Sequence, residues 1–226
     1  MNLSRLTAVA VATLAAACAA TAPAGAATAC GQANYAYAGV SSADARYGIG
    51  ARISTLSAPA IAAGHIAGWV GVGGLGLGPS GSTEWLQVGI SVTPGEDPAL
   101  YYEVALPGAA PRYVMLKGHL PVGRSYDVAV LESRHQLGYW RVWVNGSPMT
   151  ARIHLPGSNG VWRPIATAES WNGDEAGTCN NLAFKFSGIR VAAKPGGAWQ
   201  PINGRVLADA GYRVQKTGNS LFALRG

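Results

Sequence analysis

Charge is scarce in this chain. Only 12% of its 226 residues are Asp, Glu, Lys or Arg, and 11 are acidic. The 17 Lys and Arg give a net charge of +6, but they are scattered singly, without the basic stripe of a nucleic-acid-binding surface. We therefore expect no nucleic-acid partner, and we assign the positive charge to solubility.

The residue patterns of several common active sites are missing as well. The four histidines stand apart, with no H-x-x-x-H or H-x-H pair and no cysteine cluster that would complete a zinc site. The segment "GPSGS", residues 78–82, is not the G-x-S-x-G turn of a serine hydrolase, and no strand-turn-helix context surrounds it. We expect no metal and no cofactor, which leaves carboxylate chemistry.

The one long apolar run lies at the N-terminus, where an Arg is followed by Ala, Val and Leu residues and then by small residues of the A-x-A type. This pattern predicts a secretory signal peptide over residues 1–26, and hence a secreted protein with no membrane contact once the signal is removed. Lipidation at Cys18, in "LAAAC", is the less favoured alternative because the leucine lies one position too far upstream.

Removal of the signal leaves two of the three cysteines, Cys30 and Cys179. In an oxidising compartment such an even pair predicts one disulfide. Almost the whole mature chain lies between the two residues, so we expect a single β-sandwich domain over residues 30–195. Residues 196–226 are expected to add terminal strands or a tail, and the protein is expected to be a monomer.

The mature sequence shows no sustained helical period, and its Gly and Pro residues would interrupt a helix. Short segments instead alternate apolar and polar residues, with turn residues between them, as in "YGIGARIST", "EWLQVGIS", "YDVAVLES" and "YWRVWVNG". Many short strands over about 200 residues indicate an all-β fold. We predict a two-sheet antiparallel β-sandwich, a concanavalin/lectin-like jelly roll.

The alternation also predicts which residues share a face of a sheet. In "TEWLQVGIS", Leu86, Val88 and Ile90 lie on one side and Trp85 and Gln87 on the other. By the same parity, the residues expected to point into the core are Ile66, Val70, Val72, Tyr102, Val104 and Leu106. The opposite face is rich in aromatic and polar groups that suit ligand contact in a groove; its predicted members are Trp69, Trp85, Gln87, Tyr101 and Glu103.

Two carboxylates stand within apolar strand-like runs, Glu103 in "YYEVAL" and Glu169 in "IATAESW". A carboxylate in such a place must be hydrogen-bonded or have a raised pKa. In a groove it is a candidate general acid or base. An ion pair with a structural partner would explain it equally well, and the candidate partners are Arg112, Arg141 and Arg163.

The ordered run "AGWVGVGG…LQVGIS…YYEV…AESW…FSGIRVAA" resembles the eqolisins, the secreted glutamic peptidases, over residues 36–192. The motifs of that family have the form W-V-G-I-D-G, L-Q-T-G, W-Y-E, A-E-W and F-G-x-V-x-F-x-N-A. The resemblance implies a sandwich of two curved seven-stranded sheets that displays a Gln and a Glu in a peptide-binding groove.

On the matching positions, Glu169 would be the general base acting on a water, and Gln87 would orient that water and stabilise the oxyanion. Trp69 and Glu103 would support the groove, with Tyr101 standing where the family has Trp. Two departures are visible. Gly73 stands where the family has Asp, and the Trp of the A-E-W motif is moved one place, to position 171.

Three functions remain open at this point. The first is a secreted, acid-acting glutamic endopeptidase that hydrolyses an extended peptide or protein substrate. The second is a non-catalytic carbohydrate- or surface-binding module with a glycan partner; it predicts an exposed platform made by Trp140, Trp143 or Trp162, and a Glu169 that pairs with Arg. The third is a degenerate eqolisin-like scaffold, which Gly73 favours.

Overall fold

The computed structural model describes residues 35–57, 59–158, 160–175 and 178–225. The signal peptide expected over residues 1–26 and Cys30 of the expected disulfide lie outside these residues, so both stay predictions. Within the described ranges the chain contains no α-helix, one 3-10 helix, η1 (Pro79–Gly81), and sixteen strands. The strands are β1 (Tyr35–Ser42), β2 (Gly48–Thr55), β3 (His65–Gly74), β4 (Glu84–Val92), β5 (Ala99–Ala105), β6 (Arg112–Lys117), β7 (Tyr126–Ser133), β8 (Gln136–Val144), β9 (Ser147–Pro148), β10 (Ile153–His154), β11 (Ile165–Trp171), β12 (Leu182–Lys194), β13 (Gly197–Pro201), β14 (Gly204–Ala208), β15 (Arg213–Thr217) and β16 (Ser220–Arg225).

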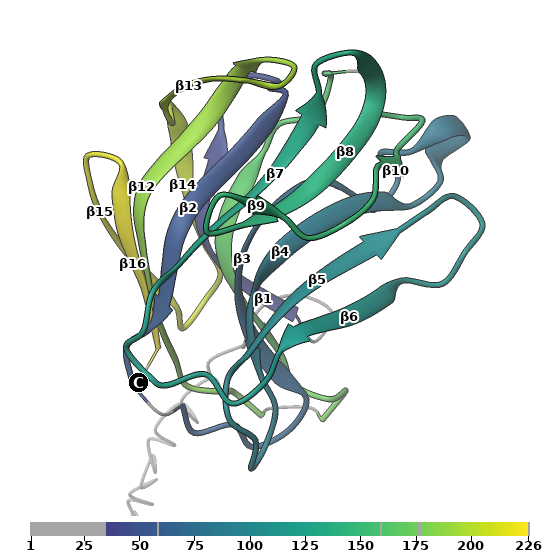
Figure 1. Ribbon diagram of the computed structural model, residues 1–226. Helices are drawn as coiled ribbons and strands as arrows, with labels where there is room; N and C mark the ends of the chain where they lie inside the picture. Colours follow the sequence, from purple (N-terminus) through teal and green to yellow (C-terminus); the bar gives the residue numbers. More distant parts are fainter. Residues whose placement is uncertain (1–34, 58, 159, 176–177, 226) are drawn as a thin grey trace, which may run out of the picture.

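The described strands form two antiparallel sheets that face each other (Figure 1). One has seven strands in the order β14-β1-β11-β3-β4-β5-β6; the other has nine, β10-β8-β7-β2-β12-β16-β15 with β13 on β12 and β9 on β8. This confirms the predicted all-β, two-sheet antiparallel sandwich, although the second sheet is larger than the resemblance implied. The strands of residues 197–225 belong to both sheets, since β14 pairs with β1 and β16 pairs with β12.

The hydrophobic core lies between the sheets and is built from alternate residues of each strand. Leu86, Val88 and Ile90 of β4 are at most 1% exposed, as their period of two predicts. The other residues predicted to point inward are also buried, with one exception. Leu106 is 37% exposed, because β5 ends at Ala105 and the chain turns away before Leu106 could enter the core.

The opposite side of the seven-stranded sheet carries the residues that the parity argument grouped together. We call it the outer face. Pairing registers place on it Tyr35, Tyr37, His65, Ala67, Trp69, Gly71, Trp85, Gln87, Ser91, Tyr101, Glu103, Tyr113, Met115, Thr167, Glu169 and Trp171. Ala67, Trp69 and Tyr101 form a small apolar cluster there, packed with Tyr37 and Ile165 and separate from the main core. The outer face therefore has a small packed apolar cluster that is separate from the core between the sheets.

Candidate active site

Glu169 lies on β11, between Tyr37 of β1 and Ala67 of β3. Its Oε2 accepts a hydrogen bond from Nε1 of Trp69 at 3.0 Å, and its Oε1 lies 3.0 Å from Nε2 of His65. The residue is only 7% exposed. Glu169 is thus a buried carboxylate held on both oxygens, as its apolar strand context requires, and its partners are an indole and an imidazole instead of an Arg.

Gln87 lies on β4, between Gly71 of β3 and Glu103 of β5. Its Nε2 donates a hydrogen bond to the hydroxyl of Tyr101 at 3.0 Å, and the residue is 7% exposed. A Cβ atom at Gly71 would lie 2.9 Å from the Cβ of Gln87, so the missing side chain at Gly71 makes room for the amide. Gln87 is therefore a fixed amide on the outer face.

Gln87 and Glu169 lie on the same face, in rows on either side of the row that holds Trp69 and Tyr101. Glu169 pairs with Ala67, and Ala67 pairs with Ser91, which is four residues beyond Gln87 on β4. At about 3.3 Å per residue, the backbones of Glu169 and Gln87 are therefore offset by roughly 13 Å along the strand direction. Gly89 of β4 pairs with both Trp69 and Tyr101, so these two residues share the row between Glu169 and Gln87. In the described chain Glu169 bonds to Trp69 of this middle row and Gln87 bonds to Tyr101 of the same row. The other oxygen of Glu169 lies against His65, and no hydrogen bond joins Gln87 to Glu169 there.

Electrostatics on the outer face is dominated by the charge of Glu169 and by burial. Burial raises the pKa of Glu103, and the neighbouring Glu169 carboxylate raises it further, while His65 lowers it. Burial also raises the pKa of Tyr101 and of Tyr37, again with a contribution from Glu169. In weak acid the two tyrosines are neutral, and Glu103 takes up a proton more readily than an ordinary Glu. Burial and the neighbouring Glu169 together disfavour a negative charge on Glu103.

Aromatic rings line both sides of the Glu169 region. Tyr35 stacks on Tyr37 and on Trp171, with ring centroids 6.3 and 6.2 Å apart. On the β5–β6 side, Tyr101 stacks on Tyr113 at 4.9 Å, and the hydroxyl of Tyr113 lies 2.9 Å from Oγ of Ser91. Such rings offer flat apolar area with polar edges, which suits contact with an extended chain.

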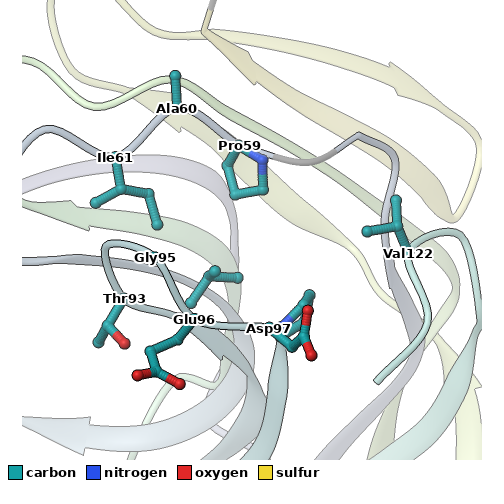
Figure 2. Close-up of a pocket in the computed structure, with 10 residues that line it drawn as sticks. Pro59, Ala60, Ile61, Thr93, Gly95, Glu96, Asp97 and Val122 are labelled. Carbon is teal, nitrogen blue, oxygen red and sulfur yellow. The ribbon is translucent and has the colours of Figure 1, made fainter. Parts of the chain in front are cut away.

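Two cavities border the turn that follows β4. The first, of about 350 Å³, is lined by residues 59–61, 92–93, 95–98 and Val122, and Figure 2 shows Glu96 and Asp97 on the side opposite Pro59 and Ile61. The second, of about 380 Å³, opens on the outer face between Ser91, Tyr113 and Met115. Neither of these two cavities is lined by Gln87 or Glu169.

His65 is the residue of the candidate site that sequence reasoning missed. The spacing of the histidines in the sequence made it look isolated, because its partner Glu169 is 104 residues away in the chain. A signal was nevertheless present: His65, Ala67 and Trp69 alternate along one strand, so parity places His65 on the same face as Trp69.

Two of the three tryptophans that the carbohydrate-binding alternative expected on an exposed platform are buried in the described structure. Trp140 is fully buried and its Nε1 donates to Oγ of Ser158, while Trp162 is 4% exposed and donates to the carbonyl of Leu77. Trp143 is half-buried on the nine-stranded sheet. Alternation in "YWRVWV" places Trp140 on the inner side of β8, facing the core, and Trp143 on the opposite side of the strand.

Clustered metal ligands and membrane-spanning helices are both absent from the described residues. These residues include no group of three or more His, Cys, Asp or Glu arranged to hold a metal ion. The same part of the chain contains no helix long and apolar enough to cross a bilayer.

Comparison with solved structures identifies the fold. Scytalido-glutamic peptidase bound to a peptide-based transition-state analogue superposes with a TM-score of 0.56 at 13% identity, covering 87% of this chain and 100% of that one. SCP-B, an eqolisin peptidase in complex with the tripeptide Ala-Ile-His, gives 0.52 at 12% identity with the same coverage. The chain has the eqolisin fold. No protein-family model and no curated protein sequence matches it.

The departure from the eqolisin pattern at Gly73 has a structural cause. Gly73 has a φ of +84°, and a Cβ atom there would lie 2.2 Å from the carbonyl oxygen of Glu84. An L-residue is strained at this φ, and no side chain fits against the backbone of β4. The β3–β4 strand pair is therefore built around a glycine, and an Asp cannot simply be restored at this position.

Proposed function

We propose that this protein is a secreted, acid-acting glutamic endopeptidase, in which Glu169 and Gln87 hydrolyse peptide bonds of an extended peptide or protein substrate. One observation carries the proposal. In an eqolisin fold, one sheet face carries a buried carboxylate bonded to Trp69 and His65 and a buried amide bonded to Tyr101, with Trp69 and Tyr101 in the row between them.

In the proposed reaction the ionised carboxylate of Glu169 takes a proton from a water molecule, and the water oxygen attacks the carbonyl carbon of the scissile bond. The carboxylate can do this although two donors already hold it, because its two oxygens offer about four lone-pair positions. The proton then passes from Glu169 to the leaving nitrogen as the carbon–nitrogen bond breaks.

Gln87 would stabilise the oxyanion that forms on the substrate. Its amide nitrogen carries two protons, and one of them is used in the bond to the hydroxyl of Tyr101. The other is free to donate to the developing charge, an interaction that is typically worth about 3 kcal/mol in a preorganised site. Tyr101 thereby acts as the support that fixes the amide.

Acid conditions suit this site because Glu103, whose pKa is raised, loses its charge there. A neutral Glu103 removes a competing negative charge close to Glu169 and to the oxyanion. Trp85, on the outer face beside Gln87, and Tyr101 would contact the substrate backbone or side chains. Export by the signal peptide and a disulfide between Cys30 and Cys179 complete the proposal for an extracellular enzyme.

The test is cleavage of an unfolded protein substrate by the purified mature protein from pH 2 to pH 7, compared with Glu169→Gln and Gln87→Ala. Exposed residues supply matched controls, Glu96→Gln and Gln215→Ala, which make the same chemical changes away from the site. We expect cleavage that the first pair abolishes and the second pair leaves intact. Cleavage that is indifferent to Glu169→Gln, or no cleavage at any pH, contradicts the proposal and favours the glycan-binding alternative.

A further inference from the structure

We propose that the side of the nine-stranded sheet turned away from the core binds an acidic polysaccharide, a polymer of sugar units that carry carboxylates. We call this side the basic face. Glu169 and Gln87 lie on the other sheet of the sandwich, so the inference does not rest on the proposed function. It assigns a binding role to positive charge that the sequence alone attributes to solubility.

Strand pairing gathers cations that the sequence shows as scattered. In this sheet β8, β7, β2 and β12 lie side by side (Figure 1), and outward residues alternate with core residues along each strand. Pairing registers place six Lys and Arg side chains on the basic face; they are Arg52, Arg141, Lys185, Arg190, Lys194 and Arg213. Asp127 is the one acidic residue that the described strands place there. The face is therefore strongly positive, and a polyanion complements it.

Arg190 is the most closely held cation of the basic face. Its guanidinium crosses β2 above Gly50, where a Cβ atom would lie 3.5 Å from Cζ of Arg190. Its Nη2 donates to Oδ1 of Asp127 on β7 at 2.6 Å, and its Cζ lies 5.3 Å from the centre of the Trp199 ring. Within the described residues the guanidinium makes no other hydrogen bond, and the side chain is 32% exposed. Its remaining N–H groups are thus oriented for a carboxylate of a ligand.

Two tryptophans flank this guanidinium. Trp143 of β8 lies in the same row across the sheet as Arg190, and the residues between them in this row are small. Those residues are Ala129 of β7 and Gly50 of β2. Trp199 lies beyond Arg190 on β13, which pairs with β12, and it is 38% exposed. At about 4.8 Å per strand, the two tryptophan backbones are roughly 19 Å apart across the sheet, which is room for a short oligosaccharide.

The combination of rings and cations indicates the kind of polymer. Positive charge alone attracts any polyanion, but it gives no reason for indoles beside the cations. An acidic polysaccharide uses both groups, because its carboxylates bind guanidinium while the apolar faces of its sugar rings stack on indoles. Nucleic acids also combine charge with stacking, but the export expected from residues 1–26 favours a polysaccharide. Nucleic acids and anionic lipid surfaces are therefore outcomes of the test.

The first experiment measures binding of the mature protein to polygalacturonate by affinity electrophoresis at pH 6, where ordinary carboxylic acids are ionised. One variant neutralises three exposed cations of the basic face: Arg52→Gln, Lys194→Gln and Arg213→Gln. A matched variant neutralises three exposed cations of the seven-stranded sheet: Arg112→Gln, Lys117→Gln and Arg205→Gln. Both variants have the same net charge, and thermal unfolding confirms that both are folded.

We expect the basic-face variant to bind polygalacturonate about 3- to 100-fold more weakly than wild type, because each exposed charge pair contributes roughly 1.4- to 5-fold. The matched variant should bind within about twofold of wild type, since local charge pairs contribute little to exposed cations on the far sheet. Equal losses in the two variants would mean that binding follows net charge alone, which overturns the proposal. Absence of binding by the wild type overturns it as well.

A second experiment separates sugar rings from charge. Polyacrylate carries carboxylates without sugar rings, so it serves as the matched polymer. We expect Trp199→Ala to weaken binding to polygalacturonate by roughly 2- to 10-fold and to leave binding to polyacrylate nearly unchanged. An equal effect on both polymers refutes the stacking role and with it the polysaccharide.

Other polyanions complete the test. We expect duplex DNA and vesicles of phosphatidylserine and phosphatidylcholine to bind more weakly than polygalacturonate at the same salt concentration. Tighter binding to DNA or to the vesicles overturns the proposal in favour of that partner. None of these measurements uses hydrolysis, so failure of the peptidase assignment and failure of the basic face are distinguishable.

Discussion

Gly73→Ala is the substitution whose cost the structure specifies most closely. Gly73 lies near the end of β3 with a φ of +84°, and a Cβ atom would stand 2.2 Å from the carbonyl oxygen of Glu84 and 2.8 Å from Cα of Trp85. Real Cβ atoms do not approach backbone so closely, so the start of β4 must move. The substitution therefore combines backbone strain with a steric overlap.

The chain provides a control that carries only the first of these costs. Gly76 has a φ of +71°, and its nearest potential contact is 4.0 Å away, so Gly76→Ala should lose only the roughly 1–2 kcal/mol of an L-residue in the left-handed region. Gly73→Ala should lose this amount and about 1–3 kcal/mol more from overpacking. The expected totals are about 1–2 kcal/mol for Gly76→Ala and about 2–5 kcal/mol for Gly73→Ala.

Urea unfolding of both variants and of wild type measures these costs. We expect the Gly73→Ala midpoint to lie clearly below that of Gly76→Ala. Gly73→Asp, which restores the eqolisin residue, should be at least as destabilising and should not raise peptidase activity. Equal losses at the two glycines, or a stable Gly73→Asp, would refute the reasoning about the β3–β4 backbone.

Three further predictions concern the site. Trp69→Phe keeps the ring packing but removes the 3.0 Å donor to Glu169; a hydrogen bond to a charged group is worth about 1.5–3 kcal/mol, so kcat/KM should fall roughly 10- to 100-fold. Tyr101→Phe leaves the buried Gln87 amide without its acceptor, which should cost about 1–3 kcal/mol in urea unfolding and should lower kcat. Glu103 has a folded-state pKa above its ordinary 4.5, so the native state binds more protons than the unfolded state, and its contribution to stability is lost as the pH rises from 4.5 through the raised pKa. Glu103→Gln should therefore flatten the fall of Tm between pH 4.5 and 8, and an unchanged slope would contradict the assignment.

Much of the fold could be predicted because the alternation of apolar and polar residues along each strand is visible in the sequence. The alternation around Gln87 placed Leu86 and Val88 in the core and Trp85 on the outer face, and the pairing registers agree. Where a strand ends is set by turn geometry, which alternation does not show. This is why Leu106 was wrongly expected in the core.

The site could be predicted only in part, for a similar reason. Parity on single strands grouped Trp69, Gln87 and Glu103, but contacts between distant strands depend on sheet order and register. The partnership of His65 with Glu169 arises only when β3 pairs with β11. The conformation of Gly73 likewise depends on its contact with β4, so the sequence showed a missing Asp without showing why.

The central claim is that the carboxylate of Glu169 activates a water for peptide-bond hydrolysis. The most direct measurement is the initial rate of cleavage of an unfolded protein at pH 4 by the mature protein and by Glu169→Gln, with thermal unfolding confirming that both are folded. The account predicts cleavage by the wild type and none above background by the variant. Equal rates for the two proteins, or a folded wild type without activity, would contradict it.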